Sequence, residues 1–186
     1  MRPYHYTYIL TVLDGIPDKE QRHECTEAVR LHWQAADFTA AGKPSEAIDL
    51  ERRAISVFKR VSGTDGLIAL SSANIGLAYG QIHRFKESIV ACQSAISFLE
   101  QSPQLTNELA TCLHTIGCSL LGLGEATDSL PYLKRAVKIW SVDQNWSSLE
   151  SKEQKISDAK ANIAHARRVA DQQTGRSWFQ RIFGAL

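Results

Sequence analysis

The chain has 186 residues, of which 44% are hydrophobic and 22% are charged, and its formal net charge is +1. These values fit one large globular domain or a short repeat array, and they argue against a disordered chain. The balanced charge gives no reason to expect DNA binding.

The cysteines and the apolar runs indicate the compartment. Cys25, Cys92, Cys112 and Cys118 lie in apolar or amphipathic stretches, and none of them forms a CxxC pair. This distribution favours buried thiols in a reducing compartment over a disulfide framework. The N-terminus has no unbroken apolar stretch of signal-peptide length, and no run of about 20 apolar residues could span a membrane. We therefore expect a cytoplasmic protein.

Residues 1–16 allow two predictions. Alternating positions typical of a strand are Tyr4, Tyr6, Tyr8, Leu10 and Val12, whereas Tyr8, Ile9, Val12 and Leu13 suit a short helix. The sequence leaves both open. The first definite helix is predicted from about Pro17 or Asp18 to Ala41.

A repeat of 41 residues organises residues 17–146 into three units, at about 28–68, 69–109 and 110–150. The columns that stay small are Ala35/Gly76/Gly117, Ala47/Ser88/Ser129 and Ala54/Ala95/Ala136, and the column that stays large is Phe38/Tyr79/Leu120. Small residues let two antiparallel helices approach closely. This close packing offsets the ~1 kcal/mol that a mid-helix glycine costs relative to alanine.

Short breaks divide each unit into two helices. Breaks inside the units are predicted at 41–46, 81–85 and 122–126, and breaks between them at 61–66 and 101–105. Gly42 and Gly124 suit helix C-termini. Pro131 is expected in the first turn of its helix, with Thr127 as the N-cap, because proline is tolerated there.

These patterns resemble the tetratricopeptide repeat. The segments that carry the resemblance are IGLAY (75–79) with ESIVACQSAI (87–96), and IGCSL (116–120) with DSLPYLKRAV (128–137). The long period is similar to that of the lengthened repeats of kinesin light chains. The resemblance covers about 28–141 and implies an all-α fold, a right-handed solenoid of three antiparallel helix pairs plus a capping helix.

The resemblance also implies a function, because such arrays usually bind peptides on a concave side lined by the first helix of each pair. By position, the lining would be His32, Trp33, Ala36, Ala73, Asn74, Leu77, His114, Thr115 and Cys118. One subclass holds a C-terminal carboxylate with a clamp of Lys, Arg and Asn, of which only Asn74 is present here. A neutral groove with an apolar component is therefore expected, in a non-enzymatic scaffold that binds a peptide or protein. Trp33 could equally be a structural anchor under the N-terminal segment.

His114 and Cys118 form the strongest candidate for chemistry in the chain. They lie four residues apart on one predicted helix, so they could act as a base and a nucleophile or as two metal ligands. The sequence shows no third orienting or ligating group. We therefore predict no catalytic residue, no metal site and no cofactor.

The C-terminal part is predicted to be a capping helix at 147–173, with Ser147 and Glu150 as a capping box, followed by an amphipathic tail at 174–186. One helical face of the tail carries Trp178, Phe179, Ile182, Phe183 and Leu186. The tail could dock on its own array, on a second copy to form a homo-oligomer, on a partner or on a membrane. One alternative function is therefore a peripheral membrane or secretion-associated adaptor that uses this tail. A second alternative is an RNA-associated repeat protein, which is less favoured because the charge is balanced outside the C-terminus.

Overall fold

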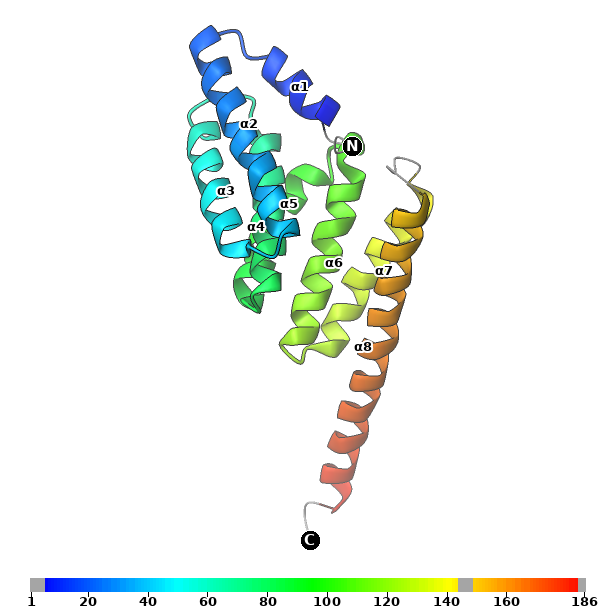
Figure 1. The fold of residues 1–186 in the computed structure, drawn as a ribbon. Coiled ribbons are helices and arrows are strands. Elements are labelled where there is room, and N and C mark those ends of the chain that lie inside the picture. The colour runs from blue at the N-terminus through cyan, green and yellow to red at the C-terminus, as the bar shows by residue number, and fades with distance from the viewer. Residues whose placement is uncertain (1–5, 144–148, 184–186) are drawn as a thin grey trace.

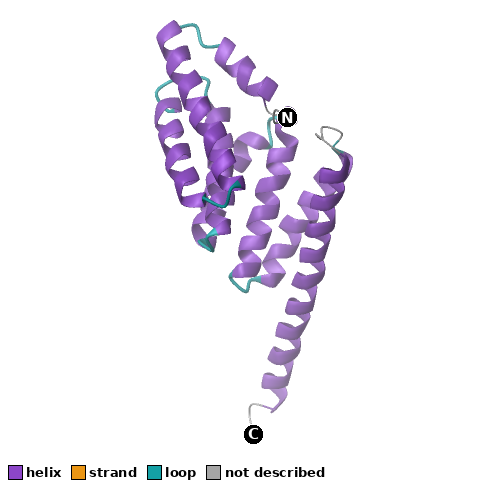
Figure 2. Cartoon of the chain, in the orientation of Figure 1, coloured by secondary structure: helices purple, strands orange, loops and turns teal. Residues whose placement is uncertain are grey.

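The computed structural model describes residues 6–143 and 149–183, and the side chains within 6–143 and 151–174. Within these ranges the structure is all-helical, without strands (Figure 2). The helices are α1 (Tyr6–Asp14), α2 (Lys19–Ala40), α3 (Pro44–Phe58), α4 (Asp65–Gln81), α5 (Phe85–Leu99), the 3₁₀ turn η1 (Pro103–Leu105), α6 (Thr106–Gly122), α7 (Ala126–Val142) and α8 (Leu149–Phe183). None of the described helices is both long enough and apolar enough to cross a membrane.

Successive helices pack in pairs and form a helical-repeat solenoid (Figure 1). The pairs are α2/α3, α4/α5 and α6/α7, and each pair also contacts the next through α3 with α4 and α5 with α6. Helix α8 follows the third pair and packs against α7 and α6. The first helices of the second and third pairs begin at Asp65 and Thr106. Each begins four residues before the predicted start of its unit, at 69 and 110.

The turns inside the three pairs share one backbone conformation. Each turn has one residue with positive φ: Gly42 at 72°, His83 at 60° and Gly124 at 81°. In each case the following N–H donates to the carbonyl five residues earlier, and these pairs are Lys43 to Phe38 at 2.8 Å, Arg84 to Tyr79 at 3.0 Å and Glu125 to Leu120 at 2.9 Å. These bonds close the helix ends in the manner of a Schellman motif. The predicted C-terminal roles of Gly42 and Gly124 are confirmed.

The two repeat glycines lie where the two helices of a pair approach each other closely. A β-carbon on Gly76 would lie 2.3 Å from the Cys92 sulfur and 3.1 Å from the Cys92 backbone nitrogen, both on α5. A β-carbon on Gly117 would lie 2.6 Å from the Leu133 side chain on α7. The close approach predicted from the small columns is therefore present in the second and third pairs.

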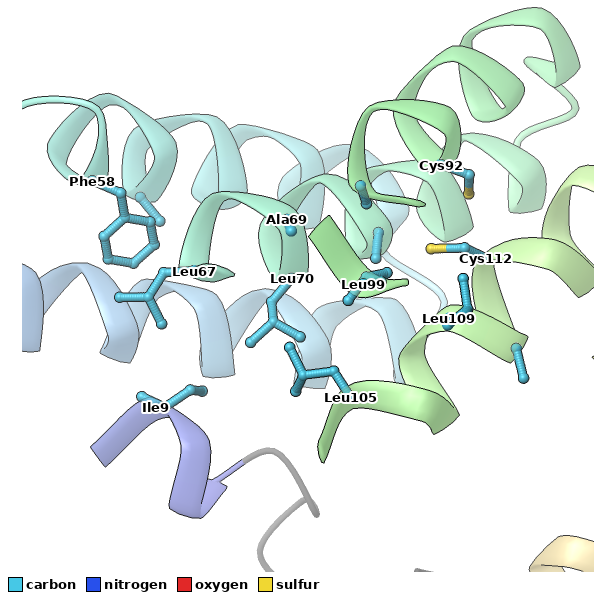
Figure 3. Close-up of a cluster of buried hydrophobic side chains, with 14 of the residues drawn as sticks. Ile9, Phe58, Leu67, Ala69, Leu70, Cys92, Leu99, Leu105, Leu109 and Cys112 are labelled. Atoms are coloured by element: carbon cyan, nitrogen blue, oxygen red, sulfur yellow. The ribbon is translucent and has the colours of Figure 1, made fainter. Parts of the chain in front are cut away.

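The core also follows the 41-residue period. Phe58, Leu99 and Trp140 lie in the last turns of the second helices of the three pairs and are almost completely buried. Figure 3 shows Phe58 and Leu99 in one continuous cluster with Leu67 and Leu70 of α4, and with Ile9 of α1 beside them. The N-terminal segment is thus helical where it is described, and the alternative prediction of a strand is wrong. Ile9 and Leu13, four residues apart, are buried on one face of α1, whereas Leu10, which the strand pattern would place on the same side as Tyr8 and Val12, is exposed.

Two predictions of local structure are wrong. Pro131 lies inside α7 rather than in its first turn, because α7 begins at Ala126 with Glu125 as its N-cap. The predicted boundary between capping helix and tail is also absent, since α8 continues through Gly175 to Phe183 (Figure 1). A single glycine costs a helix only about 1 kcal/mol, and the glutamines and arginine around it are good helix formers. The side chains of Trp178, Phe179, Ile182 and Phe183, as well as Ser147 and Leu186, lie outside the described part of the chain.

Candidate functional site

The first helices of the pairs form the inner layer of the array. Helix α2 contacts α4, α4 contacts α6, and α6 contacts α8. Direct contact between first helices indicates that the array curves toward this side, as the tetratricopeptide resemblance implies. The side chains that point inward from α4 and α6 are therefore those available for a groove.

A pocket of about 240 Å³ opens between the end of α4 and the second half of α6. It brings together four of the predicted groove residues, namely Leu77, His114, Thr115 and Cys118, and adds Gly80, Gln81, Phe85 and Ser119. No Asp, Glu, Lys or Arg is among these lining residues of the described chain. The pocket is therefore neutral and largely apolar.

Two glycines shape this pocket. The Phe85 ring lies so close to Gly122 that a β-carbon there would be 2.4 Å from it, which fixes the ring against the end of α6. His83 also meets the Phe85 ring edge-on, with 5.5 Å between the ring centres. At Gly80 a β-carbon would meet only ordinary contacts, 3.5 Å from Ser88 and 3.8 Å from Thr115, so the missing side chain leaves space.

His114 and Cys118 do meet, and a third group joins them. The Cys118 sulfur lies 3.5 Å from Nε2 of His114, and Nδ2 of Asn162 lies 3.2 Å from the same Nε2 and 3.3 Å from the sulfur. Asn162 belongs to α8, 48 residues from His114. The conclusion that no third group exists is therefore wrong. The error arose because α8 brings this residue in from a distant part of the chain.

The electrostatics of this trio do not favour nucleophilic chemistry. Burial raises the pKa of Cys118 to about 11, so its thiol is protonated at neutral pH. Burial lowers the pKa of His114, Lys155 lowers it further and Asp158 raises it, so the imidazole favours its neutral form. An activated cysteine needs a lowered thiol pKa, usually beside a cationic group. Within the described residues, no group of three or more His, Cys, Asp or Glu is arranged to hold a metal ion.

His32 and Asn74 belong to a different arrangement, a buried polar network around Glu51. Nδ1 of His32 lies 3.0 Å from the Glu51 carboxylate, and Nδ2 of Asn74 donates to Oε1 of Glu51 at 2.7 Å. Glu51 is only 1% exposed and His32 only 3%. The network joins α2, α3 and α4, and so connects the first two pairs. His32 therefore does not line an open groove.

Glu51 is not among the site residues predicted from the sequence. The sequence held a signal, since Ile48, Glu51 and Ala54 are three residues apart and so lie on one side of α3. Ile48 and Ala54 are both buried. A carboxylate at the centre of a buried helix face requires polar partners.

Trp33 lies under the N-terminal helix. Its ring stacks on Tyr6 of α1 with 5.5 Å between the ring centres and 26° between the planes. Of the two roles left open for Trp33, the structural anchor is the one that this contact supports.

A larger depression of about 600 Å³ lies between α2 and α3 at the outer edge of the first pair. Its charged lining is partly neutralised by two exposed ion pairs, Arg60 with Glu24 at 3.0 Å and Arg30 with Glu27 at 2.6 Å. Such exposed pairs contribute little stability. A polar outer face is what the terminal unit of a repeat array requires.

Comparison with known proteins identifies one repeat directly. The tetratricopeptide repeat family model matches residues 109–141, which lie in α6 and α7. Among solved structures, the chain is similar to a TPR-like protein from Chlorobium tepidum, with a TM-score of 0.68 and 19% sequence identity over 78% of this chain and 97% of that chain. At this identity the likeness concerns the fold. No curated protein matches the sequence significantly.

Proposed function

Since the chain is a repeat protein of the tetratricopeptide type, we propose that it is a non-enzymatic scaffold that binds a peptide or protein partner on its concave side. Repeats of this type generally mediate protein–protein interactions. The partner contacts are assigned to Leu77, His114, Thr115 and Cys118, around the pocket between α4 and α6. Trp33, His32 and Asn74 support the array from within.

The observation that carries this proposal is the chemistry of the pocket. Its volume of about 240 Å³ is below the range of about 300–1,000 Å³ that small-molecule and cofactor sites occupy. Its lining is neutral, and Leu77, His114 and Cys118 remain partly exposed. A space of this size and polarity suits one apolar side chain of a bound peptide, with Gln81 available at the rim for polar contacts.

The chemistry of Cys118, the candidate nucleophile, supports a non-enzymatic role. The Cys118 thiol is protonated at neutral pH, because burial raises its pKa to about 11. For the compartment, we propose the cytoplasm, because three of the four free thiols are buried in the core and no CxxC pair is present.

Affinity purification with mass spectrometry tests the proposal. The bait proteins are the wild type, Gly80→Leu and Ser56→Leu. Gly80→Leu fills the pocket at a position where a β-carbon meets only ordinary contacts. Ser56→Leu adds the same side chain on an exposed position of α3. We expect a partner that co-purifies with the wild type and with Ser56→Leu and is lost with Gly80→Leu, while all three proteins melt within a few degrees. The same partners on all three baits would show that the pocket is not the binding site.

A further inference from the structure

The N-terminal helix α1 lies across one end of the array. Helix α1 runs from the side of α6 toward the start of α2, where the chain turns back (Figure 1). It thereby covers the end of the inner layer at which α2 and α4 begin. The pocket between α4 and α6 lies at the other end of α4, so the two surfaces are separate.

Three side chains of α1 rest on α2 and α4. Tyr6 stacks on Trp33. Tyr8 fills the space beside Gly66, where a β-carbon would collide with the Tyr8 hydroxyl. Ile9 is fully buried and lies beside Leu67 and Leu70 (Figure 3). The surface formed by Trp33, Gly66, Leu67 and Leu70 is called the α1 seat below.

The contact residues of α1 follow the spacing of a helix bound in a groove. Tyr6, Ile9 and Leu13 are at positions i, i+3 and i+7, the pattern by which amphipathic helices anchor in apolar grooves. The opposite face of α1 is exposed, including Thr7, Leu10, Thr11 and Asp14. The α1 seat therefore already holds an amphipathic helix, supplied by the same chain.

The attachment of α1 has identifiable weaknesses. The helix has nine residues, and helices this short are marginal in water without tertiary contacts. The Nε1–H of Trp33, whose ring stacks on Tyr6, is buried without a hydrogen-bond partner among the described atoms. An unsatisfied buried donor disfavours the docked state relative to one in which water reaches the indole.

We propose that α1 is a displaceable ligand of its own array, and that the α1 seat is a second binding surface for an amphipathic helix of a partner protein. The partner helix presents an aromatic side chain at position i and branched aliphatic side chains at i+3 and i+7, as α1 does. This site goes beyond the pocket between α4 and α6 and does not depend on it. Release of α1 is the step that makes the seat available.

Hydrogen exchange of the full-length wild type, followed by mass spectrometry, tests the release of α1. Amides exchange through local opening when opening costs less than global unfolding. We expect the amides of α1 to exchange at least about 100-fold faster than those of α4 and α6, which stay protected while α1 opens. Exchange of α1 as slow as that of α4 would overturn the proposal, because α1 would then open only when the whole protein unfolds.

A second experiment tests the seat with a defined probe, a fluorescently labelled synthetic peptide of residues 6–16. In the wild type, α1 occupies the seat. The apparent affinity for the peptide is therefore the intrinsic affinity multiplied by the fraction of molecules in which the seat is open. We expect full-length Ile9→Asp, in which α1 is released, to bind the peptide at least about tenfold more tightly than the wild type. Adding Trp33→Ala to that variant should abolish binding.

Three outcomes would contradict the proposal. They are equal binding by the wild type and Ile9→Asp, undiminished binding after Trp33→Ala, and a dimer in light scattering that shows the seat taken by α1 of a second copy. If Ile9→Asp does not fold, the hydrogen exchange of the wild type decides alone. Neither experiment involves the pocket at Leu77, so loss of a pocket partner and failure of the α1 seat are separately detectable.

Discussion

His83 occupies the left-handed backbone position that Gly124 fills one repeat later. Its φ is 60° and that of Gly124 is 81°, and both residues directly follow the C-cap of the first helix of a pair. A β-carbon in this conformation costs roughly 1–2 kcal/mol, although histidine is among the residues that tolerate it better. The second pair thus retains a strained residue where the first and third pairs have glycine.

Replacing His83 by glycine should stabilise the protein by about 0.5–1 kcal/mol, because the strain is relieved and the turn stays intact. Urea denaturation of the wild type and His83→Gly measures the difference. Gly124→Ala is the matched control, and we expect it to destabilise by about 1–2 kcal/mol. A His83→Gly variant that is less stable than the wild type would mean that the ring contact with Phe85 outweighs the strain.

Filling the close contacts of the helix pairs should destabilise strongly. Gly76→Leu and Gly117→Leu should each lower the free energy of unfolding by roughly 2–4 kcal/mol, because the added side chains collide with α5 and α7. Gln101→Leu, on an exposed loop position, is the control and should have a mild effect. Thermal denaturation distinguishes the cases. If both glycine variants melt like the wild type, the helix pairs are not as closely packed as described.

Removing the buried carboxylate of Glu51 should be costly because two side chains lose this acceptor. Glu51→Leu should destabilise by about 3 kcal/mol, since His32 and Asn74 would each lose a buried contact with the carboxylate. Glu51→Gln keeps an acceptor for Asn74 and should cost only about 1 kcal/mol. Urea denaturation of the two variants compares them directly. Equal loss in both would show that charge, rather than hydrogen bonding, holds the network together.

The Cys118 thiol should react slowly at neutral pH and faster in base. Its pKa of about 11 lies above the ordinary value of 9.0, so at pH 8 its thiolate fraction is about 100-fold below that of an unperturbed thiol. Maleimide labelling of native protein, with Cys118→Ser as control, should accelerate about tenfold per pH unit between pH 8 and 10. Rapid labelling of Cys118 below pH 7 would instead reveal a lowered pKa and an activated thiol.

The raised pKa of Cys118 also predicts how the stability of the protein depends on pH. The folded state holds the Cys118 proton more tightly than the unfolded chain, because the raised pKa belongs to the buried thiol. The free energy of unfolding should therefore fall as pH rises from about 9 to 11, and this fall should be smaller in Cys118→Ser. Guanidinium denaturation at pH 8 and pH 10 measures the difference. An identical fall in both proteins would assign it to other groups.

The repeat was predictable because it depends on local sequence patterns. Contacts within one helix pair determine the small residues at Gly76 and Gly117 and the turn glycines Gly42 and Gly124. The same contacts recur in the next pair, which produces the 41-residue period. Pro131 shows the limit of that reasoning, since its place in the helix depends on where Ala126 begins α7. Helix α7 packs against α6 and α8, and such contacts between distant segments are not visible in a local sequence pattern.

The candidate site was predictable only in part. Leu77, His114, Thr115 and Cys118 line one pocket because their columns repeat in the correct phase. Asn162 could not be foreseen, because its contact with His114 depends on how the long helix α8 lies against α6. Phe85 could not be foreseen either, since its place in the pocket depends on Gly122 in the next unit.

The Glu51 network also sets an order in which the chain can complete its structure during synthesis. Asn74 follows Glu51 by 23 residues, which takes a ribosome about one to five seconds at roughly 5–20 residues per second. Until then, the Glu51 carboxylate between α2 and α3 lacks its bond to Asn74, and burying it would be unfavourable. The first pair of helices should therefore remain open on the nascent chain until α4 emerges, so the first two pairs close as a single cotranslational event.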